Sequence, residues 1–99
     1  MTEAQFQAEL IKFCQRRGWL VHACWDGWYC DGKGFPDVVV ASPRNLVWAE
    51  LKRHTTSRVR PEQTTWAYTL QAAGEHYRRW TIANWVDGYV RAELQRLLG

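Results

Sequence analysis

Long runs of apolar residues are absent from this sequence. No stretch approaches the roughly 20 consecutive apolar residues that a membrane-spanning helix needs, and no signal-like apolar segment opens the chain. Internal repeats and low-complexity segments are also absent. These absences exclude membrane insertion and a repeat architecture, and we expect residues 1–99 to form one compact domain.

Cysteine is scarce, because Cys14, Cys24 and Cys30 form an odd set without a CxxC spacing. His22 lies near two of them, but this arrangement is weak evidence for zinc, and buried core cysteines are the favoured interpretation. We therefore expect reduced thiols and a cytoplasmic setting.

Lysine is also scarce, since only three of the 13 basic residues are Lys and the others are Arg. The formal net charge is +3. Arginine binds phosphate groups in a planar, bidentate geometry, so this composition favours a phosphate-bearing partner such as nucleic acid.

Helix and strand patterns alternate along the chain. Thr2 is a possible N-cap for the first helix and Gly18 a stop, while Pro61 and Gly74 bound a later helix in the usual way. The expected elements are a helix at 2–17, strands at 19–24, 37–42 and 46–52, a helix at 61–74, a strand at 76–83 and a helix at 84–98 capped by Asn84. The order αβββαβα predicts an α/β fold, with a mixed β-sheet flanked by helices.

Charged residues interrupt two strands that should be buried. Because side chains alternate along a strand, Glu50 and Lys52 share one face, about 7 Å apart. A two-residue turn at Pro43–Arg44 or Arg44–Asn45 would place Asp37 opposite Glu50 or Lys52 on that face, whereas a three-residue turn would not. Two carboxylates and one ammonium would then converge.

Two carboxylates this close repel each other unless a cation lies between them. Mg²⁺ fits, because it prefers oxygen ligands, is usually held by one or two carboxylates and keeps several waters. Lys52 could orient a water or offset charge on a phosphate. The alternative interpretation is an ordinary salt-bridged strand surface.

The same residues resemble a known family. The "PD" at Pro36–Asp37 and the "ELK" at 50–52 resemble the PD-(D/E)xK nuclease signature. The motifs "TEAQFQ", "GWLVH", "GFPDVVV", "AELKR", "RPEQTTWAYTLQAAG" and "W...NWVD" are similar, in this order, to the VRR-NUC subfamily, especially its short stand-alone phage-type members. The resemblance covers nearly the whole chain and implies a restriction-endonuclease-like fold and a bacterial host or prophage origin.

The resemblance implies a role for each matching residue. Asp37 and Glu50 would bind the metal, with the backbone carbonyl of Leu51 as a further ligand. Lys52 would serve catalysis. Gln63 would support it from the start of the second helix, on the inward face that it shares with apolar residues; it could also simply cap that helix.

The family also uses an acidic residue from the first helix. Glu3 is the natural match, Gln7 lies one turn later on the same face, and Glu9 is the less favoured choice. One departure concerns Arg60, which stands where relatives often carry a helix-capping Ser before the "PEQ". This substitution puts the cap in doubt rather than the chemistry.

Basic residues near the proposed metal are candidate DNA contacts. Three lie in the polar linker after the third strand, and one lies in the glycine-rich loop that also contains Trp25 and Trp28. The aromatic pair could meet DNA bases or form a hydrophobic lid. The candidate contacts are Lys33, Arg53, Arg58 and Arg60.

These features predict an endonuclease, dependent on Mg²⁺ or Mn²⁺, that hydrolyses phosphodiester bonds in branched DNA. The leading specific prediction is a homodimeric Holliday junction resolvase, because two sites suit a symmetric junction. The first and third helices are the expected dimer contacts, since Tyr89, Leu94 and Leu97 add apolar surface. The alternatives are a flap-specific or nicking nuclease, a catalytically silent nucleic-acid-binding module, or a structural phage component.

Overall fold

The structure is a computed structural model that describes residues 1–24 and 32–99. Its sheet has four strands in the order β1-β2-β3-β4. The β1–β2 and β2–β3 pairs are antiparallel, whereas β3 and β4 are parallel. The strands are β1 (Leu20–Ala23), β2 (Val38–Ala41), β3 (Leu46–Lys52) and β4 (His76–Thr81). The α/β class and the mixed sheet are therefore as predicted.

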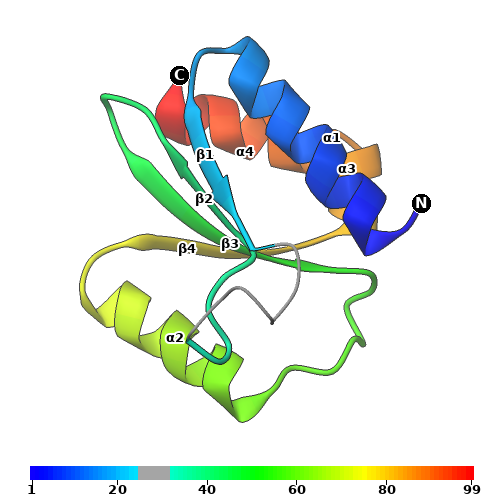
Figure 1. The fold of residues 1–99 in the computed structure, drawn as a ribbon, viewed down its shortest axis with the longest axis vertical. Coiled ribbons are helices and arrows are strands. Elements are labelled where there is room, and N and C mark those ends of the chain that lie inside the picture. The colour runs from blue at the N-terminus through cyan, green and yellow to red at the C-terminus, as the bar shows by residue number, and fades with distance from the viewer. Residues whose placement is uncertain (25–31) are drawn as a thin grey trace.

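Helices cover both faces of this sheet (Figure 1). One face carries three helices, and the opposite face carries α2 alone. The helices are α1 (Glu3–Arg16), α2 (Pro61–Ala72), α3 (Ile82–Val86) and α4 (Tyr89–Leu98). Thr2 caps α1 as predicted, since its hydroxyl accepts from the backbone N–H of Gln5 at 3.1 Å.

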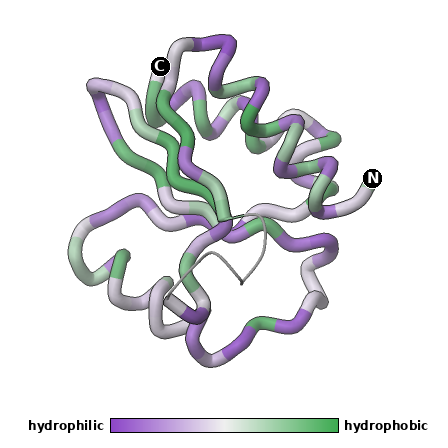
Figure 2. The backbone as a smooth tube through the Cα atoms, viewed as in Figure 1, coloured by the Kyte–Doolittle hydropathy of each residue, from purple (hydrophilic) through white to green (hydrophobic). Residues whose placement is uncertain are grey.

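The main core lies between the sheet and the three-helix layer. Alternation along β3 sends Val47, Ala49 and Leu51 into this core, while Trp48 and Glu50 face α2. Figure 2 shows hydrophobic residues concentrated along the central strands and a mostly hydrophilic linker between β3 and α2. The α2 side holds a second, smaller hydrophobic cluster of Ala67, Leu70 and Tyr77, and the same alternation presents Glu50 to α2 on this side.

The predicted helix at 84–98 is wrong in one respect, because the structure divides it into α3 and α4. Gly88 lies between them with a φ of 88°, a left-handed conformation that ends a helix and that glycine adopts at little cost. Asn84 is not the N-cap. Thr81 caps α3, and the Asn84 side chain completes the capping box by accepting from the Thr81 backbone N–H at 2.9 Å.

The β2–β3 hairpin has the two-residue turn at Pro43–Arg44. The Ser42 N–H donates to the Asn45 carbonyl at 2.9 Å, and Val38 pairs with Ala49. Asp37 precedes Val38 and Glu50 follows Ala49, so this register brings the two carboxylates side by side. Of the two turns that the sequence allowed, this is the one that sets Asp37 against Glu50.

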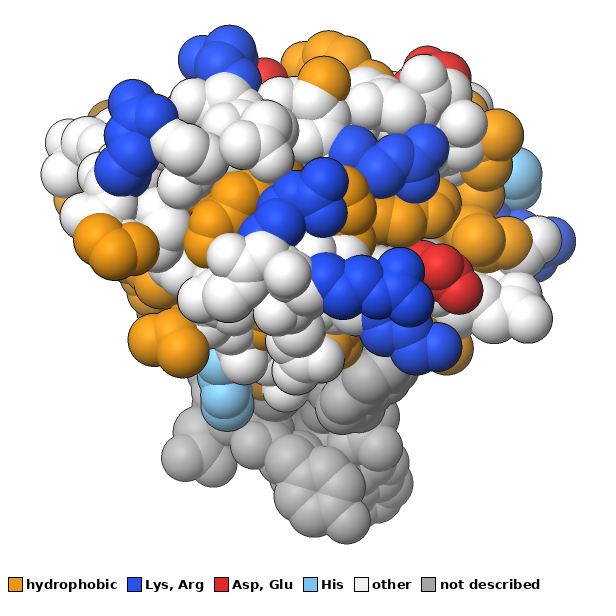
Figure 3. All heavy atoms as spheres, turned by 90° about the horizontal axis from the view of Figure 1, so that it is seen from above, with side chains coloured by type: hydrophobic (Ala, Val, Ile, Leu, Met, Phe, Trp, Pro, Cys, Tyr) orange, Lys and Arg blue, Asp and Glu red, His pale blue; other side chains and the backbone are white. Residues whose placement is uncertain are grey.

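The outer surface of α1, α3 and α4 differs from the expected dimer surface. Leu94 and Leu97 are buried in the core, so the premise that they add exposed apolar surface is wrong. Arg17 lies 3.6 Å from the centre of the Phe13 ring, and Arg91 covers Trp85. Figure 3 shows Lys and Arg side chains lying across hydrophobic ones on this face. Tyr89, the third residue of that prediction, is 52% exposed, so of the three residues only Leu94 and Leu97 belong to the core.

The cysteines differ from one another. Cys14 is a free thiol in the core, and burial raises its pKa to about 12. Cys24 is disulfide-bonded, so the expectation of reduced thiols is wrong for this residue. Cys30, Trp25 and Trp28 lie outside the described residues.

Among the helices described, none is long and apolar enough to span a membrane.

Candidate active site

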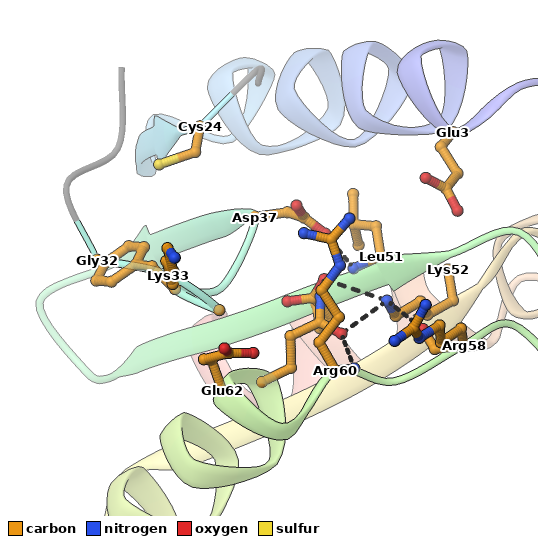
Figure 4. Close-up of a pocket in the computed structure, with 14 residues that line it drawn as sticks. Glu3, Cys24, Gly32, Lys33, Asp37, Leu51, Lys52, Arg58, Arg60 and Glu62 are labelled. Atoms are coloured by element: carbon orange, nitrogen blue, oxygen red, sulfur yellow. Dashed lines mark hydrogen bonds and ion pairs between the residues drawn. The ribbon is translucent and has the colours of Figure 1, made fainter. Parts of the chain in front are cut away.

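A cleft of about 800 Å³ opens where the end of β3, the start of α2 and the start of α1 meet (Figure 4). It lies on the side of the sheet that α2 covers. Its lining includes most of the residues predicted for the site: Glu3, Lys33, Asp37, Glu50, Leu51, Lys52, Arg58, Arg60 and Gln63. Residues far apart in the sequence therefore converge here.

Half-buried Asp37 and buried Glu50 form a carboxylate pair. Oδ2 of Asp37 accepts from the Leu51 backbone N–H at 2.7 Å. Glu50 is only 3% exposed, and its Oε1 accepts from Nε2 of Gln63 at 2.7 Å. Its Oε2 is buried and meets no hydrogen-bond donor in the part of the chain that the structure describes. Oδ1 of Asp37 and Oε2 of Glu50 are thus the oxygens available to a ligand.

Burial raises the pKa of both carboxyl groups, and the nearby Asp37 charge raises that of Glu50 further. Burial contributes most to each shift, and the pKa of Glu50 rises to about 8, with the Asp37 charge as the next cause. Burial also raises the pKa of Asp37, while the Leu51 N–H opposes this rise by stabilising the ionised form. In the absence of a cation the pair therefore does not carry two full charges at neutral pH.

This pair fits a hard divalent cation. A buried carboxylate oxygen without a donor is costly unless a cation or a proton neutralises it. Within residues 1–24 and 32–99, no group of three or more His, Cys, Asp or Glu side chains is placed to hold a metal. Two carboxylates with open positions suit Mg²⁺ or Mn²⁺, which keep water ligands, better than a closed zinc site.

Lys52 is held in place by three neighbours. Its Nζ donates to Oε1 of Gln63 at 3.0 Å and to the Arg58 carbonyl at 3.1 Å. The same Nζ lies 3.7 Å from Oε1 of Glu50. The ammonium is therefore fixed beside the carboxylate pair with little freedom to leave the cleft (Figure 4).

Gln63 joins the two sides of the site. Its amide nitrogen donates to Glu50 and its amide oxygen accepts from Lys52. The oxygen also accepts from the Arg60 backbone N–H at 3.0 Å at the start of α2. The Arg60 side chain makes no capping hydrogen bond, so Gln63 performs both roles that the sequence suggested: it caps its own helix and it contacts the site.

Glu3 lies across the cleft from the carboxylate pair (Figure 4). Its Oε1 accepts from the Arg53 backbone N–H at 2.9 Å, so it joins α1 to the end of β3. Gln7 is buried and points its amide at the Cys24 carbonyl, 3.5 Å away. Of these two candidates, Glu3 is the one that lines the cleft.

The predicted DNA contacts divide into two groups. Lys33, Arg58 and Arg60 line the cleft, whereas Arg53 is exposed and does not line it. Glu62 is a further lining residue, from the first turn of α2, that sequence reasoning missed. The rim is thus predominantly basic around an acidic centre.

Gly34 was also missed, although it positions the site. It has a φ of 77°, and a Cβ atom there would lie 2.4 Å from the Glu62 backbone carbon and 2.5 Å from the Gln63 backbone nitrogen. The segment before Asp37 therefore packs its backbone directly on the start of α2. Phe35 adds edge-to-face contacts with two Trp rings on the same side. The glycine before "FPD" was the signal that could have revealed this contact.

Gly34→Ala is therefore expected to lower the free energy of unfolding by about 2–4 kcal/mol, since it adds both left-handed strain and a steric clash. Gly18 is a matched control, because it has a φ of 76° and a Cβ atom there would meet nothing within 4 Å. Gly18→Ala should cost only the conformational part, about 1–2 kcal/mol. Urea unfolding of both variants measures the difference, and equal losses would show that Gly34 makes no essential contact.

The raised pKa of Glu50 predicts how stability depends on pH without metal. Its pKa is about 8 in the folded protein against 4.5 for an ordinary glutamate, so the folded state holds a proton that the unfolded state has lost between these values. Stability is then greatest below about pH 4.5, as far as this group is concerned, and falls as pH rises towards about 8. Melting temperatures in EDTA should show this decline, Glu50→Gln should reduce it, and added Mg²⁺ should reverse it most at the higher pH.

The fold is shared with solved structures. One is described as a "VRR_NUC domain protein", with a TM-score of 0.72 and 17% identity over 99% of this chain and 91% of that chain. Another, described as a "VRR_NUC domain", has a TM-score of 0.64 and 21% identity over 92% of this chain and 97% of that one. No family model and no curated protein matches the sequence.

Proposed function

The chain has the VRR_NUC fold, and we propose that it is a nuclease of the PD-(D/E)xK type that hydrolyses DNA phosphodiester bonds with a divalent metal. One observation carries the proposal: a carboxylate pair, with Glu50 buried and Asp37 half-buried, has two open oxygens beside a fixed ammonium in a cleft with a basic rim. A structural ion pair would not leave Oε2 of Glu50 without a partner.

Asp37 and Glu50 would hold the metal, with the Leu51 carbonyl as a further ligand. When bound, Mg²⁺ or Mn²⁺ polarises a phosphodiester and lowers the pKa of a coordinated water. Lys52 would stabilise negative charge that grows on the phosphate, or orient the attacking water. Gln63 is hydrogen-bonded to both Lys52 and Glu50 and fixes the position of one side chain relative to the other, so it acts as a positioning residue.

Lys33, Arg58 and Arg60 are proposed to bind the DNA backbone on both sides of the scissile phosphate. Phosphate contacts from basic side chains fix the register of a nucleic acid without reading its sequence. The carboxylate pair alone would repel DNA, so the basic rim and the metal together make approach favourable.

Replacing Arg58 and Arg60 together with Gln should weaken binding to every DNA shape, because both contacts are electrostatic. The slope of log affinity against log salt should flatten by up to about 0.9 for each lost contact with duplex DNA. Fluorescence anisotropy across a salt series measures this slope, and exposed Lys12 of α1 provides a control as Lys12→Gln. An unchanged slope in the double variant would mean that the linker faces away from DNA.

We further propose that the preferred substrate is branched DNA and that the active form is a homodimer resolving four-way junctions. One cleft can cut one strand per encounter, so symmetric paired incision needs two subunits. The dimer surface is not assigned to α1 and α4, because their outer face carries arginines that would repel a second copy.

Mixed dimers with one Asp37→Ala subunit test this finer proposal. They should nick a four-way junction without making the paired cut, while wild-type dimers make both cuts. Sedimentation of the wild type as a monomer, with symmetric paired cleavage by that monomer, would contradict the dimer and favour the flap-specific or nicking alternative. Absence of cleavage for every DNA shape would favour a silent binding module.

A further inference from the structure

A second groove, of about 600 Å³, runs along the flank of α2 that faces away from Gly34. Its α2 lining comes from residues at helical spacing, one face of the helix, and its other wall is Arg79 of β4. The lining residues are Thr64, Ala67, Tyr68, Gln71, Ala72 and Arg79. None of the residues that the candidate active site uses belongs to this groove.

The groove begins one strand away from the carboxylate pair. Glu50 of β3 and Arg79 of β4 are direct partners in the parallel register, and neighbouring strands lie about 4.8 Å apart. Asp37 lies on the other side of Glu50, next to Val38 of β2. Three charged residues therefore lie side by side across the sheet face under α2, in the order Asp37, Glu50 and Arg79. Arg79, the basic residue, is the one at the groove.

The groove offers an aromatic ring, a cation and hydrogen-bonding groups. The Tyr68 side chain is 75% exposed, and Arg79 is exposed and forms no ion pair with any residue that the structure describes. Nη2 of Arg79 lies 3.5 Å from the Tyr77 hydroxyl, which orients the guanidinium. Thr64 and Gln71 can donate and accept hydrogen bonds, and no acidic side chain among the described residues lines the groove.

These groups suit an unpaired nucleic-acid strand better than a protein. An exposed ring can stack on a splayed base, and a nearby Arg can hold its phosphate, which is how proteins bind single strands with little sequence preference. The bases of an intact duplex are already stacked on each other and do not offer a free face. Ala67 and Ala72 give too little apolar surface to anchor a hydrophobic partner.

We propose that this groove binds single-stranded DNA that extends from the cleavage site, with Tyr68 stacking on a base and Arg79 holding a phosphate. The position of this strand next to the scissile bond rests on the proposed nuclease function. A flap supplies such a strand and a fully paired four-way junction does not, so occupation of this groove during cleavage would favour the flap-specific alternative.

Binding of a fluorescent oligothymidine, compared with a duplex of equal length, tests the groove by anisotropy in EDTA, where no metal-dependent cleavage occurs. Tyr68→Ala should weaken oligothymidine binding about tenfold, whereas Tyr68→Phe should preserve it, because the ring remains. Arg79→Gln should flatten the salt slope by about 0.7. Duplex binding should change little in each variant. Tyr89→Ala and Arg16→Gln, exposed residues on the other side of the sheet, are the matched controls.

Failure of the wild type to bind oligothymidine, or losses no larger than in the controls, would overturn the proposal. Conversion of a dimer to a monomer by Tyr68→Ala in sedimentation would assign the groove to a second copy and would overturn it as well. The result is separable from the nuclease function, because binding is measured without metal. If the groove variants lose single-strand binding but the wild type cleaves nothing with Mg²⁺ or Mn²⁺, the groove stands as a binding site and the nuclease function fails.

Discussion

Asp37→Ala and Glu50→Ala are each expected to abolish metal-dependent DNA cleavage while the protein stays folded. Each change removes one of the two carboxylates that leave an oxygen open in the cleft. Loss of a residue that merely supports a metal ligand costs roughly 10–100-fold, so loss of a ligand should exceed roughly a hundredfold. The fold should persist because each change also removes repulsion between two closely placed carboxylates, of which Glu50 is buried.

Single-turnover cleavage rates and thermal melting of the same preparations measure this result. Glu62→Ala is the matched control, since Glu62 is an exposed carboxylate that lines the same cleft but lies on the first turn of α2. It should keep nearly full activity. Full activity in either the Asp37 or the Glu50 variant would contradict the site assignment.

Lys52→Ala should bind metal normally yet cleave slowly. Its ammonium lies 3.7 Å from a Glu50 oxygen but cannot itself be a metal ligand, so metal affinity should be retained. Removing one group that stabilises charge in a transition state typically costs about 10²–10³ in rate. Cleavage rates should fall by this amount, and Mn²⁺ binding followed by electron paramagnetic resonance should match the wild type.

Lys12→Ala provides the control for loss of one positive charge, because Lys12 is exposed on α1 outside the cleft. A Lys52 variant that loses metal affinity but cleaves at the wild-type rate in excess metal would show that Lys52 organises the carboxylates rather than the reaction.

The strands and the β2–β3 hairpin could be predicted from the sequence because the signals are local. The range of β3 agrees with its prediction at both ends, 46 and 52, since strand formers are bounded there by turn residues and a polar linker. The hairpin left two turns open, and the structure has the one at Pro43–Arg44. With this turn, register and alternation set Asp37 beside Glu50 rather than Lys52, an alternative that the sequence had left open.

Other features depend on contacts between distant segments, which periodicity does not encode. Gly34 contacts the start of α2, which follows it in the chain by almost 30 residues. Predicting this contact would require knowing how the loop packs on that helix. Glu50 pairs with Arg79 on a parallel strand. Parallel strands are joined by a long crossover, here through α2, so no short turn fixes which residues pair. The break at Gly88 was visible as a residue, but a glycine inside a helical pattern does not always end a helix.

Cleavage of labelled DNA by the purified wild-type chain is the decisive test of the proposed nuclease function. Four-way junction, flap, duplex and single-stranded DNA would each be incubated with Mg²⁺, with Mn²⁺ or with EDTA. We expect hydrolysis of branched DNA with either metal and none in EDTA. Cleavage that continues unchanged in EDTA, or no cleavage of any substrate with either metal, would contradict a metal-dependent nuclease.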